Sequence, residues 1–178
     1  AYSETCAAIG LVFFARRMLE IKPDRSFSDV MERALYNTVL AGMAADGKSF
    51  FYVNPLEVYP KACHEDARKF HVKPIRQKWF GCACCPPNIA RLLSSLAMYA
   101  YTENEDTLFA HLFVGGSVKK DVNGKELSFE VTTDMPWQGT TVYSCTNEQS
   151  VHGSLAIRIP EWSRSFKVSG VTGELDEN

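Results

Sequence analysis

The stretch Trp79-Phe80-Gly81-Cys82-Ala83-Cys84-Cys85-Pro86-Pro87-Asn88 contains three of the six cysteines in this 178-residue chain, followed by two prolines. Thiols at this density form a disulfide, bind a metal or react. A disulfide within the group is disfavoured, because adjacent cysteines are bridged only with strained geometry, and Cys82 and Cys84 point the same way in an extended chain. Metal binding and thiolate chemistry remain, and both require partners from elsewhere in the sequence.

The composition is that of an ordinary globular protein that can bury a core, with 46% apolar residues, 22% charged residues and a formal net charge of −2. This small charge favours neither nucleic acid nor an anionic membrane surface as a partner. No apolar run approaches the roughly 20 residues that span a bilayer. The clustered thiols fit a reducing compartment, so we expect a cytoplasmic protein.

Apolar residues at helical spacing predict three helices in the first hundred residues. The first ends near Pro23 and is expected to be buried on much of its circumference, because it is apolar on one face (Leu11, Phe14, Ala15, Met18) and on the facing side (Ala8, Val12, Leu19). The second follows a segment, Ser26 to Asp29, that resembles a capping box. The third begins at Pro86-Pro87, since proline suits the first turn of a helix.

The rest of the chain has different patterns. Ser49 to Val53 is predicted to be a short strand, and Asn54 to Lys78 an irregular loop. After Thr102, apolar and polar residues alternate, for example from Leu127 to Val131, and Asn123-Gly124 is a strong hairpin signal. Helices followed by strands argue for two domains or an α+β arrangement, and against a βαβ sheet. We expect the boundary near residues 103 to 106.

Cys84 and Cys85 offer two thiolates, half of a tetrahedral zinc site. Pro86 biases Cys85 away from helical geometry, so the pair is expected in the loop just before the helix, where the helix dipole lowers a thiol's pKa. Glu4 and Cys6, at the start of the first helix, are the best candidates for the other half. Three interpretations stay open beside this one: a buried core Cys6, a structural zinc knot and a redox switch.

The patterns of the other chemistry-bearing residues are weaker. Tyr52 is either a hydrogen-bond donor near a site or an ordinary packing residue, and Trp137 and Trp162 are expected in the core of the strand-rich half rather than as sugar platforms. Four further residues are expected to be structural or solvated, although the two histidines could also be ligands or substrate contacts: Cys63, Cys145, His64 and His71.

Five segments together resemble the bacterial β-L-arabinofuranosidases of glycoside hydrolase family 127. They lie in collinear order over nearly the whole chain: Glu4-Thr5-Cys6-Ala7, Phe51 to Glu57, Trp79 to Arg91, Met135-Pro136-Trp137 and Arg158 to Ser163. The resemblance implies helices of an (α/α)6 toroid followed by antiparallel β-sandwich strands. Residues 1–103 would then be part of the catalytic toroid, and residues 104–178 part of the sandwich.

The same resemblance implies a zinc ion (Zn²⁺) held by Glu4, Cys6, Cys84 and Cys85. Cys84 would be the nucleophile that attacks the anomeric carbon of a terminal β-L-arabinofuranose, with retention of configuration through a glycosyl-thioether. Tyr52 would hydrogen-bond the sugar or steady Cys84. The family's general acid/base is a glutamate a little upstream of Glu4, so that residue is absent from this chain.

We therefore expect a fragment of a larger enzyme that is inactive as an isolated polypeptide. Its substrate would be an arabinose-containing oligosaccharide or glycoconjugate, without nucleic acid or membrane, and a homodimer is left open. The alternative from another class is a non-catalytic, zinc-stabilised carbohydrate-binding or interaction module.

Overall fold

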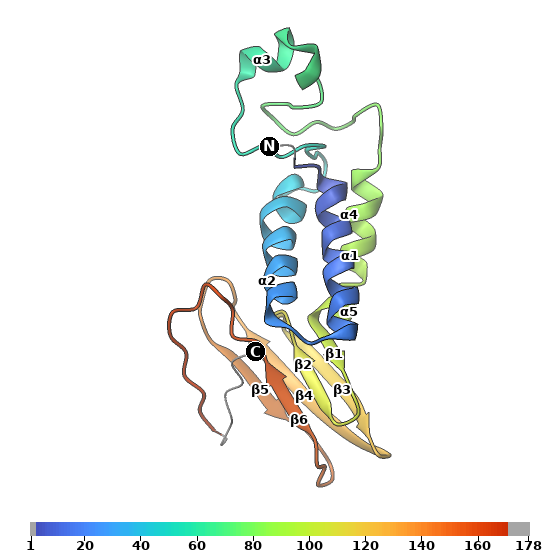
Figure 1. Ribbon diagram of the computed structural model, residues 1–178, viewed down its shortest axis with the longest axis vertical. Coiled ribbons are helices and arrows are strands. Elements are labelled where there is room, and N and C mark those ends of the chain that lie inside the picture. The colour runs from blue at the N-terminus through green and yellow to red at the C-terminus, as the bar shows by residue number, and fades with distance from the viewer. Residues whose placement is uncertain (1–2, 171–178) are drawn as a thin grey trace. The chain divides into compact units, whose positions relative to one another are not determined.

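The computed structural model describes residues 3–170, in which helices come first and strands follow (Figure 1). The helical elements are α1 (Thr5–Ile21), α2 (Arg25–Ala34), the π-helix η1 (Leu35–Leu40), α3 (Pro60–Glu65), the 3-10 helix η2 (Ala67–Lys69), α4 (Cys85–Ser94) and α5 (Ala97–Ala100). The strands are β1 (Tyr101–Glu103), β2 (Thr107–Ala110), β3 (Gly116–Val122), β4 (Lys125–Thr133), β5 (Thr141–Cys145) and β6 (Ser154–Ile157). This order confirms the predicted fold class. None of the helices in the described range is long and apolar enough to cross a membrane.

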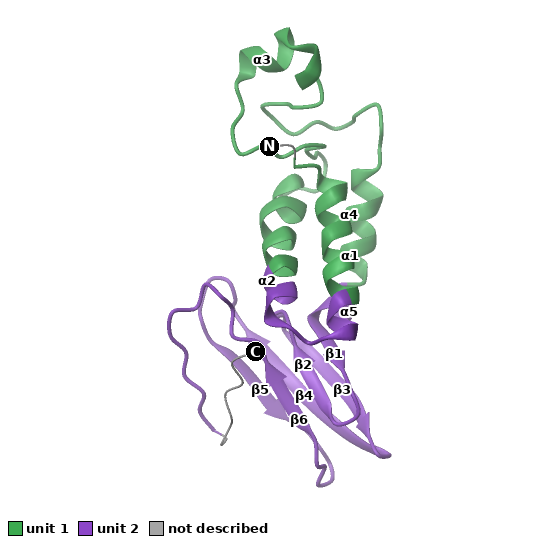
Figure 2. Cartoon of the chain, viewed as in Figure 1, with its two compact units in different colours: residues 1–17, 30–95 green, residues 18–29, 96–178 purple. Residues whose placement is uncertain are grey.

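The chain divides into two compact units (Figure 2). Residues up to 17 together with 30–95 form unit 1, and residues 18–29 together with those from 96 onward form unit 2. Helices α1 and α2 therefore each contribute residues to both units. The division into domains at residues 103 and 104 stays a prediction.

In unit 1, α1 is less widely buried than predicted. Ile9, Val12 and Ala15 are buried, whereas Leu11 is 43% exposed and Phe14 is 59% exposed. The prediction is wrong for Leu11 and Phe14 and right for Val12 and Ala15, because α1 is apolar on opposite faces and periodicity alone does not say which face meets the neighbouring helix.

Helix α4 lies beside α1 in this unit (Figure 1). It buries Ile89 and Leu92. The Arg91 guanidinium lies over the Phe13 ring of α1, 4.6 Å from its centroid. These contacts hold the two helices side by side through their length in the unit, which brings their N-terminal turns together.

The predicted strand at residues 49–53 is wrong. This segment makes only isolated antiparallel pairs, Met43 with Phe50, Phe50 with Gln77 and Glu4 with Val53. Each partner is a short piece of loop or a helix start, so no ladder of successive pairs can form. The loop predicted from 54 to 78 contains two short helices, α3 and η2, the first opened by Pro60 in its first turn.

Thr5 fixes the start of α1 against this extended segment. Its side chain is fully buried. The Thr5 hydroxyl donates to the carbonyl of Phe51 at 2.8 Å and accepts from the Asn54 side-chain amide at 2.9 Å. The Thr5 backbone amide donates to the carbonyl of Tyr52 at 3.0 Å. Gly42 lies against the same hydroxyl, where an added Cβ would come within 3.0 Å of Thr5 Oγ1.

Unit 2 contains two three-stranded sheets, ordered β1-β2-β6 and β3-β4-β5. The predicted hairpin is confirmed, because Val122 pairs with Lys125 across a turn in which Asn123 and Gly124 have φ of 54° and 77°. Asparagine and glycine tolerate these left-handed conformations best. The strands are not all antiparallel, since β2 and β6 run parallel.

The core of unit 2 comes from inward-facing residues of β2, β3 and β4, whose members are Leu108, Ala110, Val122, Leu127 and Val131. The predicted core positions of Trp137 and Trp162 are wrong, because Trp137 is 88% exposed and Trp162 is also exposed. Trp137 lies in the connection between β4 and β5, outside the strands whose buried residues form the core.

Buried polar contacts complete unit 2. Arg158 donates to Asp29 at 2.6 Å, and both side chains are almost fully buried. The predicted capping box at residues 26–29 is wrong, because Asp29 forms this ion pair and Asp24 caps α2 instead, accepting from the Ser26 amide at 2.9 Å. Hydrogen bonds from the Ser26 hydroxyl and amide lower the pKa of Asp24 to about 2.

Replacing Thr5 with valine tests the contact that fixes the start of α1. Thr5→Val keeps the shape but removes the hydroxyl, leaving the buried Phe51 carbonyl and the Asn54 amide without this partner. We expect the free energy of unfolding to fall by about 1–3 kcal/mol, measured by chemical denaturation. Thr5→Ser keeps the hydroxyl and should lose less. An equal loss in both variants would show that methyl packing, and not hydrogen bonding, dominates.

Candidate metal and active site

Three cysteines meet where the N-terminal turns of α1 and α4 lie together. Cys6 is in the first turn of α1, Cys84 immediately precedes α4, and Cys85 is its first residue. Their sulfur atoms all lie within 4.8 Å of one another. The Cys6 and Cys85 sulfurs are 3.8 Å apart, and those of Cys84 and Cys85 are 3.7 Å apart. All six cysteines of the chain are free thiols, so none of these contacts is a disulfide.

The backbone of this pair differs from the prediction. Cys84 has helical φ and ψ of −74° and −33°, and Cys85 belongs to the helix rather than to the preceding loop. The bias against helical geometry before a proline is only a preference. Here Cys85 is completely buried, and Pro86 occupies the first turn, where a missing N–H breaks no helical hydrogen bond.

The three sulfurs have different surroundings. Cys85 is fully buried, whereas Cys6 and Cys84 are half-buried. The Asn88 side-chain amide donates to Cys6 Sγ at 3.1 Å. Burial raises the pKa of Cys85, and the adjacent Cys6 and Cys84 sulfurs raise it further. The predicted lowering of thiol pKa at this helix start is therefore wrong for Cys85, because lost hydration and neighbouring negative charge outweigh the helix dipole.

Tyr52 lies at the same site. A hydrogen bond between its hydroxyl and Cys84 raises the pKa of Tyr52, and burial and the charges of Cys84 and Glu4 raise it further. The phenol is therefore neutral and remains a hydrogen-bond donor. Its ring packs at a tilt against Phe80, with centroids 5.8 Å apart, which ties the extended segment to the loop that leads into α4.

The structure brings only part of the predicted ligand set together. Among the residues that the structure describes, the group of converging ligand atoms contains the three thiols and not the Glu4 carboxylate. Glu4 lies directly before α1, where it pairs with Val53. Cys82 is exposed and outside the group, and His64 is exposed on α3.

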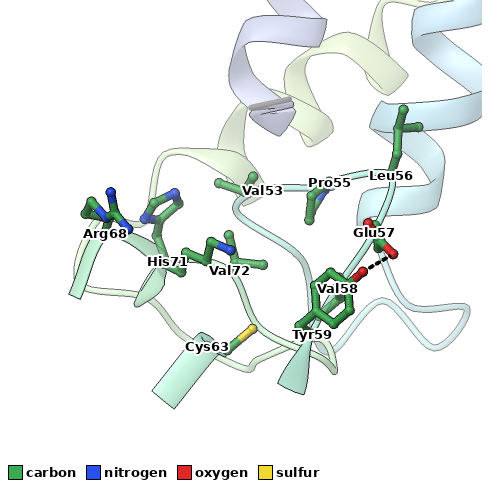
Figure 3. Close-up of a pocket in the computed structure, with 11 residues that line it drawn as sticks. Val53, Pro55, Leu56, Glu57, Val58, Tyr59, Cys63, Arg68, His71 and Val72 are labelled. Carbon is green, nitrogen blue, oxygen red and sulfur yellow. Dashed lines mark hydrogen bonds between the residues drawn. The ribbon is translucent and has the colours of Figure 1, made fainter. Parts of the chain in front are cut away.

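A separate pocket of about 440 Å³ lies in the segment that follows Tyr52 (Figure 3). The Tyr59 hydroxyl at its rim donates to Glu57 at 2.6 Å. The predicted structural Cys63 and the predicted loop residue His71 both line this pocket rather than the thiol group. The other lining residues are Val53, Pro55, Leu56, Val58, Arg68, Lys69 and Val72.

Sequence reasoning missed two residues of the site. Thr5 stands between the candidate ligands Glu4 and Cys6, but nothing in the sequence indicates its buried hydrogen bonds. Asn88 closes the cysteine stretch, where no role is predicted for it. Its position four residues after Cys84, one helical turn, could have placed it beside the thiols.

Comparisons with known proteins give the same family as the sequence motifs. The family model described as "Beta-L-arabinofuranosidase, GH127 catalytic domain" matches residues 1–98, and the one described as "Beta-L-arabinofuranosidase, GH127 middle domain" matches residues 107–177. A relative named non-reducing end beta-L-arabinofuranosidase, from Bifidobacterium longum subsp. longum, is 37% identical over 178 residues, covering 97% of this chain and 26% of its own.

Solved structures agree. A GH127 beta-L-arabinofuranosidase from Geobacillus stearothermophilus has a TM-score of 0.87 and 53% identity, covering 93% of this chain and 26% of that one. A second structure, described as a GH127 beta-arabinofuranosidase, has a TM-score of 0.78 and 37% identity, covering 91% and 24%. This chain spans about a quarter of the length of these relatives.

The family and these relatives are β-L-arabinofuranosidases, which are glycoside hydrolases. The resemblance carried by the cysteine stretch and the Glu-Thr-Cys motif is thereby confirmed. Because the catalytic-domain match covers more than half of the sequence, this chain belongs to the GH127 β-L-arabinofuranosidase family.

Proposed function

We propose that this chain is part of a retaining glycoside hydrolase that releases terminal β-L-arabinofuranose, with Cys84 as nucleophile and zinc as cofactor. The observation that carries the proposal is the convergence of three cysteine sulfurs at the N-terminal ends of α1 and α4. The proposed substrate is an arabinose-containing oligosaccharide or glycoconjugate. Six free thiols suit a reducing compartment, so we also propose a cytoplasmic location.

The spacing of the sulfurs fits a zinc ion. A tetrahedral site with Zn–S bonds of about 2.3 Å places its sulfurs about 3.8 Å apart. The distance from Cys6 Sγ to Cys85 Sγ is 3.8 Å and that from Cys84 Sγ to Cys85 Sγ is 3.7 Å, and both match this sulfur–sulfur distance. We assign Cys6, Cys84 and Cys85 as ligands and Glu4 as the fourth. Glu4 immediately precedes α1. Its charge contributes to the raised pKa of Tyr52, and the Tyr52 hydroxyl is hydrogen-bonded to Cys84.

A bound zinc ion would supply positive charge that keeps the thiols deprotonated. Such charge is needed most at Cys85, whose burial opposes ionisation. Cys85 is fully buried and has no surface to offer a sugar, which leaves it the role of a permanent ligand. Cys84 is half-buried, so its sulfur is the better placed of the adjacent pair to meet a substrate.

The proposed reaction has two displacements at the anomeric carbon. Cys84 Sγ forms a bond to the anomeric carbon while the bond between this carbon and the leaving-group oxygen breaks. The leaving-group oxygen takes a proton from a group outside the described residues. Water then attacks the same carbon and gives a proton to the conjugate base of that group, while the carbon–sulfur bond breaks to restore the thiolate. Two inversions give net retention of configuration.

Tyr52 is proposed to direct the nucleophile or bind the sugar. Its neutral hydroxyl donates to Cys84, which restricts the direction of that sulfur. When Cys84 bonds to carbon, its sulfur becomes a weaker acceptor, and the Tyr52 hydroxyl is then available to a sugar hydroxyl. This is a positioning role that requires the phenol to stay protonated.

Cys84→Ser tests the nucleophile in the full-length protein that contains this sequence. Serine is nearly isosteric, but its hydroxyl is not ionised at neutral pH. We expect kcat to fall by about 10³-fold or more, measured on an aryl β-L-arabinofuranoside. Cys82→Ser, an exposed thiol of the same stretch, should keep wild-type turnover. Wild-type turnover by Cys84→Ser would show that the nucleophile is another residue.

Metal analysis tests the cofactor. We expect about one zinc ion per chain in protein purified under reducing conditions, measured by mass spectrometry of the metal, because three thiols within 4.8 Å match a structural set of zinc ligands. Cys85→Ala should lose the zinc and lower the melting temperature, whereas Cys145→Ser should change neither. Protein that contains no zinc, and whose melting temperature does not respond to added zinc, would contradict the proposed site.

A further inference from the structure

Asn88 connects the two helices of the thiol site through a contact with sulfur. It lies in the first turns of α4, and its side-chain amide reaches across to α1, where Nδ2 donates to Cys6 Sγ at 3.1 Å. Its backbone amide donates to the carbonyl of Cys84 at 3.3 Å, the first intrahelical bond of α4. Asn88 is therefore fixed by the helix whose start carries the other two thiols.

This hydrogen bond distinguishes Cys6 from the other two sulfurs. The Cys6 sulfur receives an amide donor, the Cys84 sulfur receives the phenol of Tyr52, and Cys85 contacts the two neighbouring sulfurs. A donor stabilises negative charge on sulfur and draws electron density away from it. It also fixes the direction of the sulfur lone pairs, as partners of metal ligands generally do.

We propose that Asn88 is a positioning residue that holds Cys6 as a resident metal ligand by fixing the direction of its sulfur. The inference rests on the proposed function, because it concerns the ligand set assigned there. It adds a role for a residue outside that set. The amide suits this role because it is neutral and does not titrate, so it donates to sulfur without adding charge to a crowded anionic site.

Two substitutions separate the donor from the shape of the side chain. Asn88→Asp has almost the same size, but an ionised carboxylate has no N–H and repels a thiolate. Asn88→Leu has similar volume and removes both donor and charge. Asn88→Gln keeps an amide donor on a longer stem and serves as the conservative rescue. Asn37→Leu is the matched control, because the Asn37 amide donates to the Arg33 carbonyl at 3.1 Å, away from any sulfur.

The experiment measures zinc affinity of the full-length protein by competition with a chromophoric chelator, and the thiolate-to-metal charge-transfer band after loading with cobalt(II). We expect Asn88→Asp to weaken zinc binding by about 10–100-fold and Asn88→Leu to weaken it less, in line with the loss of other partners of metal ligands. The cobalt band should shift in both variants. Asn88→Gln should recover part of the affinity, and Asn37→Leu should match the wild type.

Several results would overturn the inference. Zinc affinities within twofold of the wild type and an unchanged cobalt band in both Asn88→Asp and Asn88→Leu would leave the zinc site intact and remove the role of Asn88. A variant that is only less stable, and whose folded protein binds zinc as the wild type does, would show a purely structural role. Wild-type protein that binds neither metal would overturn this inference and the proposed cofactor together.

Discussion

The site depends on the buried hydroxyl of Thr5. This group accepts from the Asn54 amide and donates to the Phe51 carbonyl, while the Thr5 backbone amide donates to the carbonyl of Tyr52. The candidate ligands Glu4 and Cys6 flank Thr5 in the sequence. Tyr52 lies between Phe51 and Asn54, the two partners of the Thr5 hydroxyl. One fully buried threonine therefore sets the distance between the start of α1 and the segment that carries the phenol. A valine of the same shape would fill the space but leave buried polar groups unpaired.

Electrostatic repulsion between neighbouring sulfurs limits the three thiols to a protonated state or a cation-bound state. Two unit charges 3.7 Å apart repel by about 4–5 kcal/mol at an effective dielectric constant of about 20, which suits a partly buried pair. The Cys84 and Cys85 sulfurs are at this separation, and Cys85 has no solvent to offset its charge. The group therefore either keeps its protons or holds a cation. A protonated cluster gains little from such close sulfur contacts, whereas a zinc ion needs this spacing.

The sequence predicted the family, and the gathering of Cys6, Cys84 and Cys85, better than it predicted the local backbone. Unusual residues in a specific order identified the family, and Asn123-Gly124 located a hairpin because few residues tolerate its φ angles. Predictions failed where two physical preferences compete. Helix α1 is apolar on opposite faces, and the exposure of Leu11 and Phe14 depends on the positions of the neighbouring helices, which periodicity does not contain. Cys85 is helical because burial outweighed the bias imposed by Pro86.

Contacts between distant segments of the chain were the other feature that the sequence did not predict. A strand at residues 49–53 was predicted from its aromatic and β-branched composition, but strand formation depends on a partner ladder that this unit does not provide. Trp137 was assigned to a core because large aromatic residues are usually buried, yet it lies in a connection beyond the end of β4. Neither the Asn88 amide nor the Thr5 hydroxyl carries a composition signal, since their roles arise from residues about 50 to 80 positions away.

Three chemically identical side chains thus acquire different roles from their surroundings. Cys85 is fully buried, which suits the proposed role of metal ligand, Cys6 accepts a hydrogen bond from the Asn88 amide, and Cys84 keeps partial exposure. The Tyr52 phenol also donates to Cys84, which by itself would weaken this sulfur as a nucleophile. The two donors differ in whether a substrate offers them another hydrogen-bond partner. The Asn88 amide is fixed by α4 between two helices, whereas a hydroxyl-rich sugar offers the phenol an alternative partner. In the proposed reaction, substrate binding would release Cys84 from its donor while Cys6 stays bound to its own, and the proposed nucleophilic role of Cys84 is consistent with that difference.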